Sequence, residues 1–168
     1  LGLTIFLNKL GKHATAVFSG DIPPAITFLN PDKTFEQTAD SLRDFIIALD
    51  KEKADHLRYK VVDDAVKIFI TPYRTTITDK DLEFSQGDYN VELVLALNVE
   101  NSESIDTALT AHGKILHDAT VVAITAGDVK SGLGSVDWHE SNASGVSEMV
   151  VELLDDLKTP KVTLDEQM

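Results

Sequence analysis

Two apolar stretches in the second half of the chain decide the predicted fold: Val91 to Leu97 (VELVLAL) and Thr120 to Thr125 (TVVAIT). Continuous apolar runs of this length are typical of strands that are covered on both faces. Apolar residues at helical spacing follow each run, over Ser104 to Leu116 and over Ala143 to Leu157. The order strand, helix, strand, loop, helix indicates a right-handed parallel crossover. We therefore expect an α/β fold with a doubly wound, mostly parallel sheet.

The first half of the chain adds a helix, a strand and a hairpin to this expectation. Leu3 to Leu10 has helical spacing and His13 to Phe18 alternates like a short strand. Further on, His56 to Val62 and Val66 to Ile70 alternate on either side of Asp63-Asp64, which predicts a β-hairpin. We place this inserted β-hairpin at about residues 45–71.

These patterns together predict a single α/β domain over residues 1–157. The first helix begins without a capping residue, so we expect the domain to be truncated at its N-terminus. Pro160 and several charged residues follow the last helix, and we expect residues 158–168 to form a tail or linker.

Composition excludes several classes of protein. The 168 residues carry 15 Lys and Arg against 28 Asp and Glu, a formal charge of −13, and 43% of them are hydrophobic. This balance is typical of a globular domain, and the acidic charge makes nucleic acid an unexpected partner. The chain has no Cys, which excludes thiolate chemistry. No apolar run approaches the roughly 18–20 residues of a membrane span, so we expect no membrane partner and a cytoplasmic location.

Two stretches resemble DHH-family phosphoesterases. The first runs from Phe6 to Lys12 (FLNKLGK) into His13 to Val17 (HATAV), and the second from Gly134 to His139 (GSVDWH) into Asn142 to Val150 (NASGVSEMV). The resemblance implies a domain that holds two manganese ions with carboxylates and histidines at strand ends. Such a pair of metals activates a water and clamps a phosphodiester or polyphosphate.

The chain departs from the DHH pattern at the metal-binding positions. Asn98 stands where the family has an Asp, and Thr125, Ala126 and Gly127 stand where it has the DHH triplet. The family's first acidic motif would precede Leu1. Hard divalent metals favour charged oxygen donors or imidazole, which these four residues lack. We expect a degenerate, non-catalytic domain without a cofactor that acts as a binding or structural module, alone or as a homo-oligomer.

Four other side chains are candidate ligands for a metal site. They are His112, His117, Asp118 and His139. His112 and His117 are five residues apart, which takes them off a common helical face. The alternative is that His112 is a surface residue and that His117 interacts with a helix dipole. A manganese-dependent phosphoesterase acting on nucleotides or short oligonucleotides stays an alternative function, in which acidic residues upstream of Leu1 would combine with Asp128, Asp137 or His139 in a shifted metal site.

The loop after the second apolar run is a candidate ligand site. Its candidate residues are Gly127, Lys130, Ser131, Gly132 and Gly134. Glycines can bring backbone amides close to a phosphate, and the lysine adds positive charge. This arrangement predicts a nucleotide or phosphate ligand and a second alternative function, a nucleotide-binding sensor. The competing interpretation is a simple turn.

The remaining conspicuous residues have structural interpretations. We expect Trp138, the one Trp of the chain, to pack a helix on the sheet. Ser144 and Glu148 fit the start of a helix. Tyr73-Arg74 is a weak sign of nucleic-acid binding. Acidic residues of the last helix are expected on its solvated face, namely Glu152, Asp155 and Asp156.

Overall fold

The computed structural model describes residues 1–159 and 162. The chain divides into two compact units, and each is described by itself. The first unit comprises Leu1–Leu42 and the chain from Tyr89 onward, and the second comprises Arg43–Asp88. Within the first unit, the Asn90 N–H donates a hydrogen bond to the Leu42 carbonyl (2.8 Å). The chain therefore leaves and re-enters the first unit at adjacent points.

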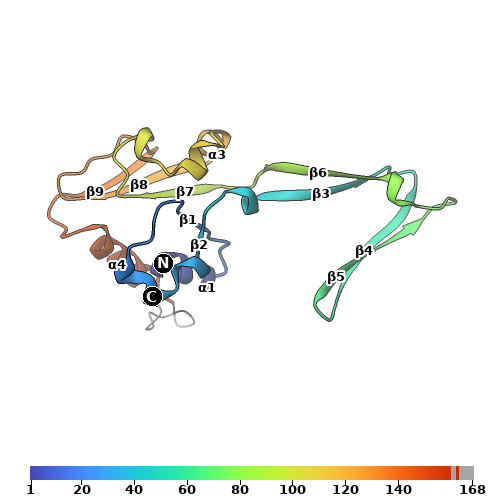
Figure 1. Ribbon diagram of the computed structural model, residues 1–168, viewed down its shortest axis with the longest axis horizontal. Coiled ribbons are helices and arrows are strands. Elements are labelled where there is room, and N and C mark those ends of the chain that lie inside the picture. Colours follow the sequence, from blue (N-terminus) through green and yellow to red (C-terminus); the bar gives the residue numbers. More distant parts are fainter. Residues whose placement is uncertain (160–161, 163–168) are drawn as a thin grey trace. The chain divides into compact units, whose positions relative to one another are not determined.

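A three-stranded parallel sheet organises the first unit. Its strands lie side by side in the order β7 (Leu93–Leu97), β8 (Thr120–Ala126) and β9 (Val136–Glu140) (Figure 1). The central strand β8 is the most buried, as its apolar sequence predicts, and Ala123 and Ile124 are 0% and 1% exposed. A separate parallel pair joins β1 (Ala16–Val17) to β2 (Phe35–Glu36).

One helix packs against this sheet, and a second helix packs against the first. Met149 of α4 (Val146–Leu157) packs with Ile124 and Ala126 of β8. On the same helix, Leu154 forms a second cluster with Leu3 and Phe6 of α1 (Gly2–Lys9). The spacing of apolar residues that predicts both helices thus corresponds to the faces that they bury.

The other helical segments are short. Two α-helices, α2 (Thr107–Thr110) and α3 (Lys114–Asp118), lie between β7 and β8. The single helix expected over Ser104 to Leu116 is therefore wrong. The 3-10 turns are η1 (Pro24–Leu29), η2 (Pro31–Lys33), η3 (Asp40–Leu42), η4 (Asp79–Asp81) and η5 (Ser102–Ser104).

The second unit consists of two two-stranded ribbons. In one, β3 (Arg43–Leu49) pairs with β6 (Leu82–Tyr89). In the other, β4 (Ala54–Val62) and β5 (Ala65–Pro72) form an antiparallel hairpin around Asp63 and Asp64. Asp63 adopts a left-handed conformation (φ 54°), as a tight hairpin turn requires.

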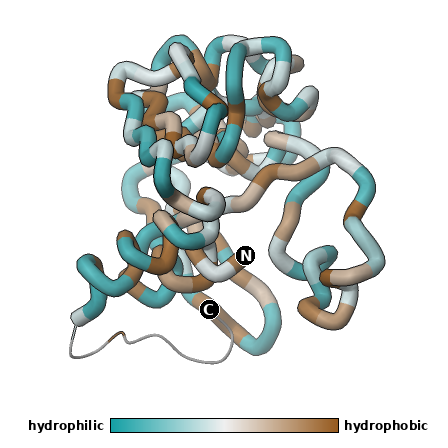
Figure 2. The backbone as a smooth tube through the Cα atoms, turned by 90° about the vertical axis from the view of Figure 1, so that its left-hand side faces the viewer, coloured by the Kyte–Doolittle hydropathy of each residue, from teal (hydrophilic) through white to brown (hydrophobic). Residues whose placement is uncertain are grey.

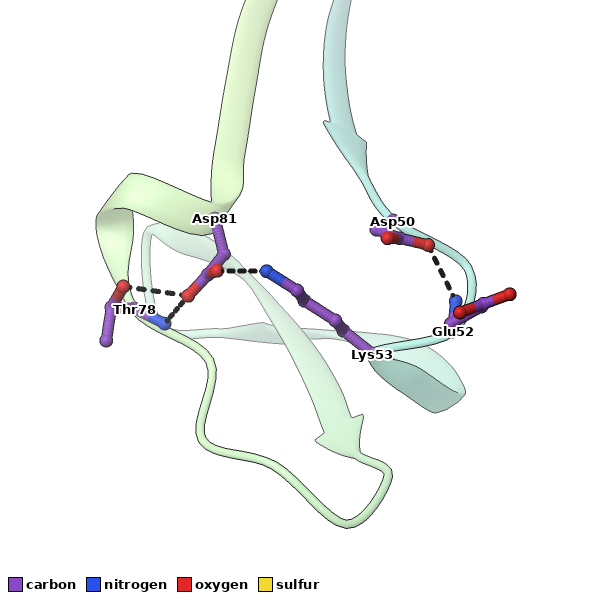
Figure 3. A network of polar contacts seen from close by, with 5 residues as sticks. All are labelled: Asp50, Glu52, Lys53, Thr78 and Asp81. Atoms are coloured by element: carbon purple, nitrogen blue, oxygen red, sulfur yellow. Dashed lines mark hydrogen bonds and ion pairs between the residues drawn. The ribbon is translucent and has the colours of Figure 1, made fainter.

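Polar contacts connect the two ribbons of the second unit (Figure 3). The Lys53 ammonium, in the turn before β4, lies 2.5 Å from the Asp81 carboxylate at the end of η4. The other Asp81 oxygen accepts hydrogen bonds from the Thr78 N–H and hydroxyl, each 2.8 Å. The Lys53 bond, followed by those from Thr78, lowers the pKa of Asp81 to about 2.

The expected fold class, a doubly wound and mostly parallel α/β sheet, is wrong. Of the described residues, 29% are helical and 34% lie in strands, and these strands form four separate small sheets. Only β7, β8 and β9 share a parallel sheet of more than two strands. The apolar runs do form parallel strands, but the other strands pair locally instead of extending this sheet.

Hydrophobic and hydrophilic segments alternate along the described backbone (Figure 2). No helix in residues 1–159 is long and apolar enough to cross a membrane. The tail expected at residues 158–168 lies mostly outside the described residues.

Candidate functional site

The carboxyl ends of β7 and β8 form the edge at which the sequence places the candidate site. Asn98 follows β7 and Gly127 follows β8, and both have a positive φ (56° and 68°). The Asn98 N–H donates to the Ile124 carbonyl (2.8 Å), and the Gly127 N–H donates to the Glu140 carbonyl (3.0 Å). Each turn residue is thus fixed to the neighbouring strand. Asn and Gly are the residue types that accept this left-handed conformation at least cost.

A pocket of about 380 Å³ opens at this edge. This volume lies in the range of small-molecule sites, roughly 300–1,000 Å³. Residues from three places line it: the end of β7, the end of β8 with its loop, and the start of α4. They are Asn98, Ala126, Gly127, Val129, Ala143, Ser144, Gly145, Val146 and Ser147. None of these carries a charged side chain, so the polar groups of the wall are an amide, two hydroxyls and the backbone.

The start of α4 supplies hydrogen-bond donors to the pocket wall. The Val146 and Ser147 N–H groups stand in the first turn, where a helix offers no acceptor of its own. Glu148, in the first turn, binds the residue before the N-cap Gly145: its carboxylate accepts from both the N–H and the hydroxyl of Ser144 (2.8 Å each). These two bonds lower the pKa of Glu148. The expected helix-start role of Ser144 and Glu148 is thereby confirmed.

Thr125 does not line the pocket. It is 1% exposed, and its Oγ1 lies 3.0 Å from Nδ1 of His139, its neighbour across the β8–β9 pair. The two side chains satisfy each other inside the sheet. Of the four residues at the expected metal positions, Asn98, Ala126 and Gly127 border the pocket, and Thr125 belongs to the core.

The structure does not assemble the alternative metal ligands. The ring of His112 packs against Tyr89, with centroids 5.0 Å apart. Nδ1 of His117 lies 2.8 Å from Asp118 Oδ1 on the exposed end of α3. His139 is held by Thr125 on β9. Within residues 1–159 and 162, no three His, Asp or Glu side chains are grouped as a metal site would require.

The loop from Gly127 to Gly134 borders the pocket only at its start. Gly127 and Val129 line the pocket, whereas Lys130, Ser131, Gly132 and Gly134 do not. Gly134 has a packing role: a Cβ there would lie 2.5 Å from the Val136 carbonyl oxygen and 2.8 Å from that of Val121. Ser131 turns into the loop, where its Oγ accepts from the Leu133 N–H (3.3 Å).

The structural interpretations of Trp138 and of the acidic residues of α4 are confirmed. Trp138 packs with the cluster of Ile124, Ala126 and Met149. Three acidic residues of α4 are exposed, namely Glu152, Asp155 and Asp156. In the second unit, the Arg74 guanidinium lies 5.1 Å from the centroid of the half-exposed Tyr73 ring.

A second hollow of about 370 Å³ borders α1 in the first unit. Its charged lining residues are Lys9, Lys33 and Glu36. Local sequence patterns predict neither this hollow nor a pocket wall that contains Ser144 and Ser147. The sequence Asn142 to Ser147 (NASGVS) carries the signal of a helix start, but its approach to the end of β8 depends on packing.

No family model matches the chain, and no curated protein is significantly similar to it.

Proposed function

We propose that this chain is a non-catalytic binding module, related to DHH phosphoesterase domains, which holds a nucleotide by a phosphate group in the pocket at the ends of β7 and β8. The observation that carries the proposal is the composition of the pocket wall. Asn98, Ala126 and Gly127 stand at the resembled family's metal positions, and they line the same pocket as Val146 and Ser147 at the start of α4.

The chemistry of the wall argues against hydrolysis. Activation of water needs a general base within reach or a metal held by anionic or imidazole ligands. No residue that lines the pocket is Asp, Glu or His. The Glu148 carboxylate beside the wall already accepts from the N–H and the hydroxyl of Ser144. The lining residues themselves can therefore bind a ligand but include no side chain suited to take a proton from water.

The same wall suits a phosphate. A helix N-terminus presents N–H groups and a positive dipole end to an anion. Gly127 and Gly145 carry no side chain that would keep a ligand away from the backbone, and the Ser147 hydroxyl adds a donor. Ligands of open sheets with parallel strands bind beyond the carboxyl ends of the strands, which is where this pocket lies.

Titration of the chain with ATP, a cyclic dinucleotide and inorganic phosphate, followed by NMR, tests the proposal. We expect saturable shifts of the Val146 and Ser147 amides. Ser147→Asp places a negative charge in the wall and should weaken nucleotide binding at least tenfold, by electrostatic repulsion. The matched control is Ser131→Asp, which adds the same charge outside the pocket and should leave binding unchanged. Absence of binding by all three probes, or equal effects of both variants, would contradict the proposal.

A further inference from the structure

One face of the β4–β5 hairpin is apolar and open to solvent. The register pairs Leu57 with Ile70, Tyr59 with Ile68 and Val61 with Val66, so these six side chains lie on the same face. Five of them are among the most exposed large hydrophobic residues of the chain: Leu57 62%, Tyr59 72%, Val61 65%, Val66 66% and Ile68 50%.

The opposite face of the hairpin is different. It carries Arg58, Lys60 and Lys67, together with Phe69. The Arg58 guanidinium lies 5.2 Å from the centroid of the Phe69 ring and covers it in part. The alternation therefore separates a basic face, suited to water, from an apolar face that gains by burial.

The apolar face supplies most of the non-polar area that a standard dimer interface contains. An aliphatic side chain exposes on the order of 100 Å² of apolar surface, so six residues at this exposure present on the order of 400 Å². A standard interface buries about 800 Å² per partner, of which a little over half is non-polar. An isolated two-stranded hairpin is also only marginally stable in water, so burial of this face would stabilise the second unit.

The charges at the two ends of the hairpin select an orientation. Asp63 and Asp64 make its tip acidic, whereas its base carries both signs, with Asp55 on β4 and Arg74 after β5. Two hairpins packed tip to tip would bring four carboxylates together. Two hairpins packed head to tail would instead place each acidic tip near the Arg74 of the other copy.

We propose that the apolar face of the β4–β5 hairpin is a homodimer interface, in which it packs head to tail on the same face of a second copy of this chain. The contact is isologous, because each copy contributes the same six side chains. This inference concerns the second unit and does not depend on the nucleotide pocket.

Sedimentation of the chain over a range of concentrations tests the dimer. Ile68→Lys puts a charge on the apolar face and should raise the dimer dissociation constant at least tenfold. Phe69→Lys, one residue along, puts the same charge on the opposite face and should leave the dimer intact. Protection of the β4 and β5 amides from hydrogen exchange verifies that the hairpin is folded in each variant. A wild-type monomer at every concentration, or a loss of the dimer in both variants, would overturn the proposal.

Cross-linking tests the orientation without perturbing the apolar face. Because the chain has no Cys, Ala65→Cys beside the tip and Thr75→Cys beside the base each introduce a unique thiol and leave Asp63, Asp64 and Arg74 in place. A mixture of the two variants, treated with a short bismaleimide, should give the mixed 65–75 dimer in preference to either homodimer. Preferential linking of Ala65→Cys to itself would mean tip-to-tip packing and would overturn the head-to-tail arrangement.

Discussion

Thr125 and His139 are joined across β8 and β9 by a hydrogen bond of 3.0 Å between Oγ1 and Nδ1. The proposed relation to DHH phosphoesterases would put Thr125 at the start of the metal-binding triplet, yet its hydroxyl is buried and already has a partner. The finding assigns Thr125 to the stability of the sheet rather than to ligand binding.

Thr125→Val should therefore lower the free energy of unfolding by about 1 kcal/mol, because it removes one partner of a largely buried hydrogen bond. Urea denaturation followed by Trp138 fluorescence measures this change. The control is Thr120→Val, because Thr120 lies at the exposed start of the same strand. This substitution should change the free energy of unfolding far less than Thr125→Val. In the double variant Thr125→Val/His139→Phe, the cost should be smaller than the sum of the single costs. An unchanged stability in Thr125→Val would contradict the role assigned to this bond.

Gly134→Ala should destabilise the first unit by about 1–3 kcal/mol, the usual cost of forcing extra volume into a packed site. The added Cβ would meet the backbone oxygens of Val136 and Val121, which cannot move without disturbing β8 and β9. Gly132→Ala is the matched control, because a Cβ at position 132 meets nothing within 4 Å. Equal unfolding midpoints in urea for the two variants would argue against a packing role for Gly134.

Phe6→Ala should cost about 3–5 kcal/mol, the usual range for truncation of a buried aromatic side chain. Phe6 is 0% exposed and joins α1 to α4 through Leu154. Phe28→Ala removes the same atoms from a residue that is 75% exposed and should change stability by less than about 0.5 kcal/mol. Thermal unfolding of both variants measures the contrast, and comparable losses would show that α1 does not contribute to the core.

The ion pair of Lys53 with Asp81 predicts an acid-sensitive second unit. Because the pKa of Asp81 is lowered to about 2, its stabilising contribution is complete above the ordinary carboxyl pKa of about 3.9. It should be lost as the pH falls from about 4 to 2. Amide hydrogen exchange at Asp81, whose N–H donates to the Thr78 carbonyl (3.1 Å), reports the change.

Asp81→Asn should weaken this protection already at neutral pH, whereas Asp79→Asn, in the same turn, should leave it unchanged. Protection of the Asp81 amide that stays constant down to pH 2 would contradict the role of the pair.

The parts of the fold that the sequence predicts are those with strong local patterns. VELVLAL and TVVAIT form β7 and β8, and the apolar spacing before Leu157 forms α4. By contrast, β9 (VDWHE) and β6 (LEFSQGDY) mix charged, polar and apolar residues, and they become strands because a neighbouring strand pairs with them. The fold class could not be derived, because local patterns do not determine which strands share a sheet.

The sequence predicts only the part of the candidate site that depends on local patterns. The edge marked by Asn98 and Gly127 follows from the ends of two strongly apolar strands. The serines of α4 join this edge only through the packing of Met149 on β8, a long-range contact that no local pattern reveals. The separation of Lys130, Ser131 and Gly132 from the pocket likewise depends on the path of the loop.

The central claim is that the pocket at the ends of β7 and β8 binds nucleotides without hydrolysing them. The most direct test incubates the chain with a cyclic dinucleotide or ATP in the presence of manganese and follows bound ligand and released product in the same samples. We predict saturable binding that Ser147→Asp weakens, together with product release no faster than in buffer with manganese alone. Manganese-dependent turnover that is lost on changing Asn98 to Ala would contradict the claim.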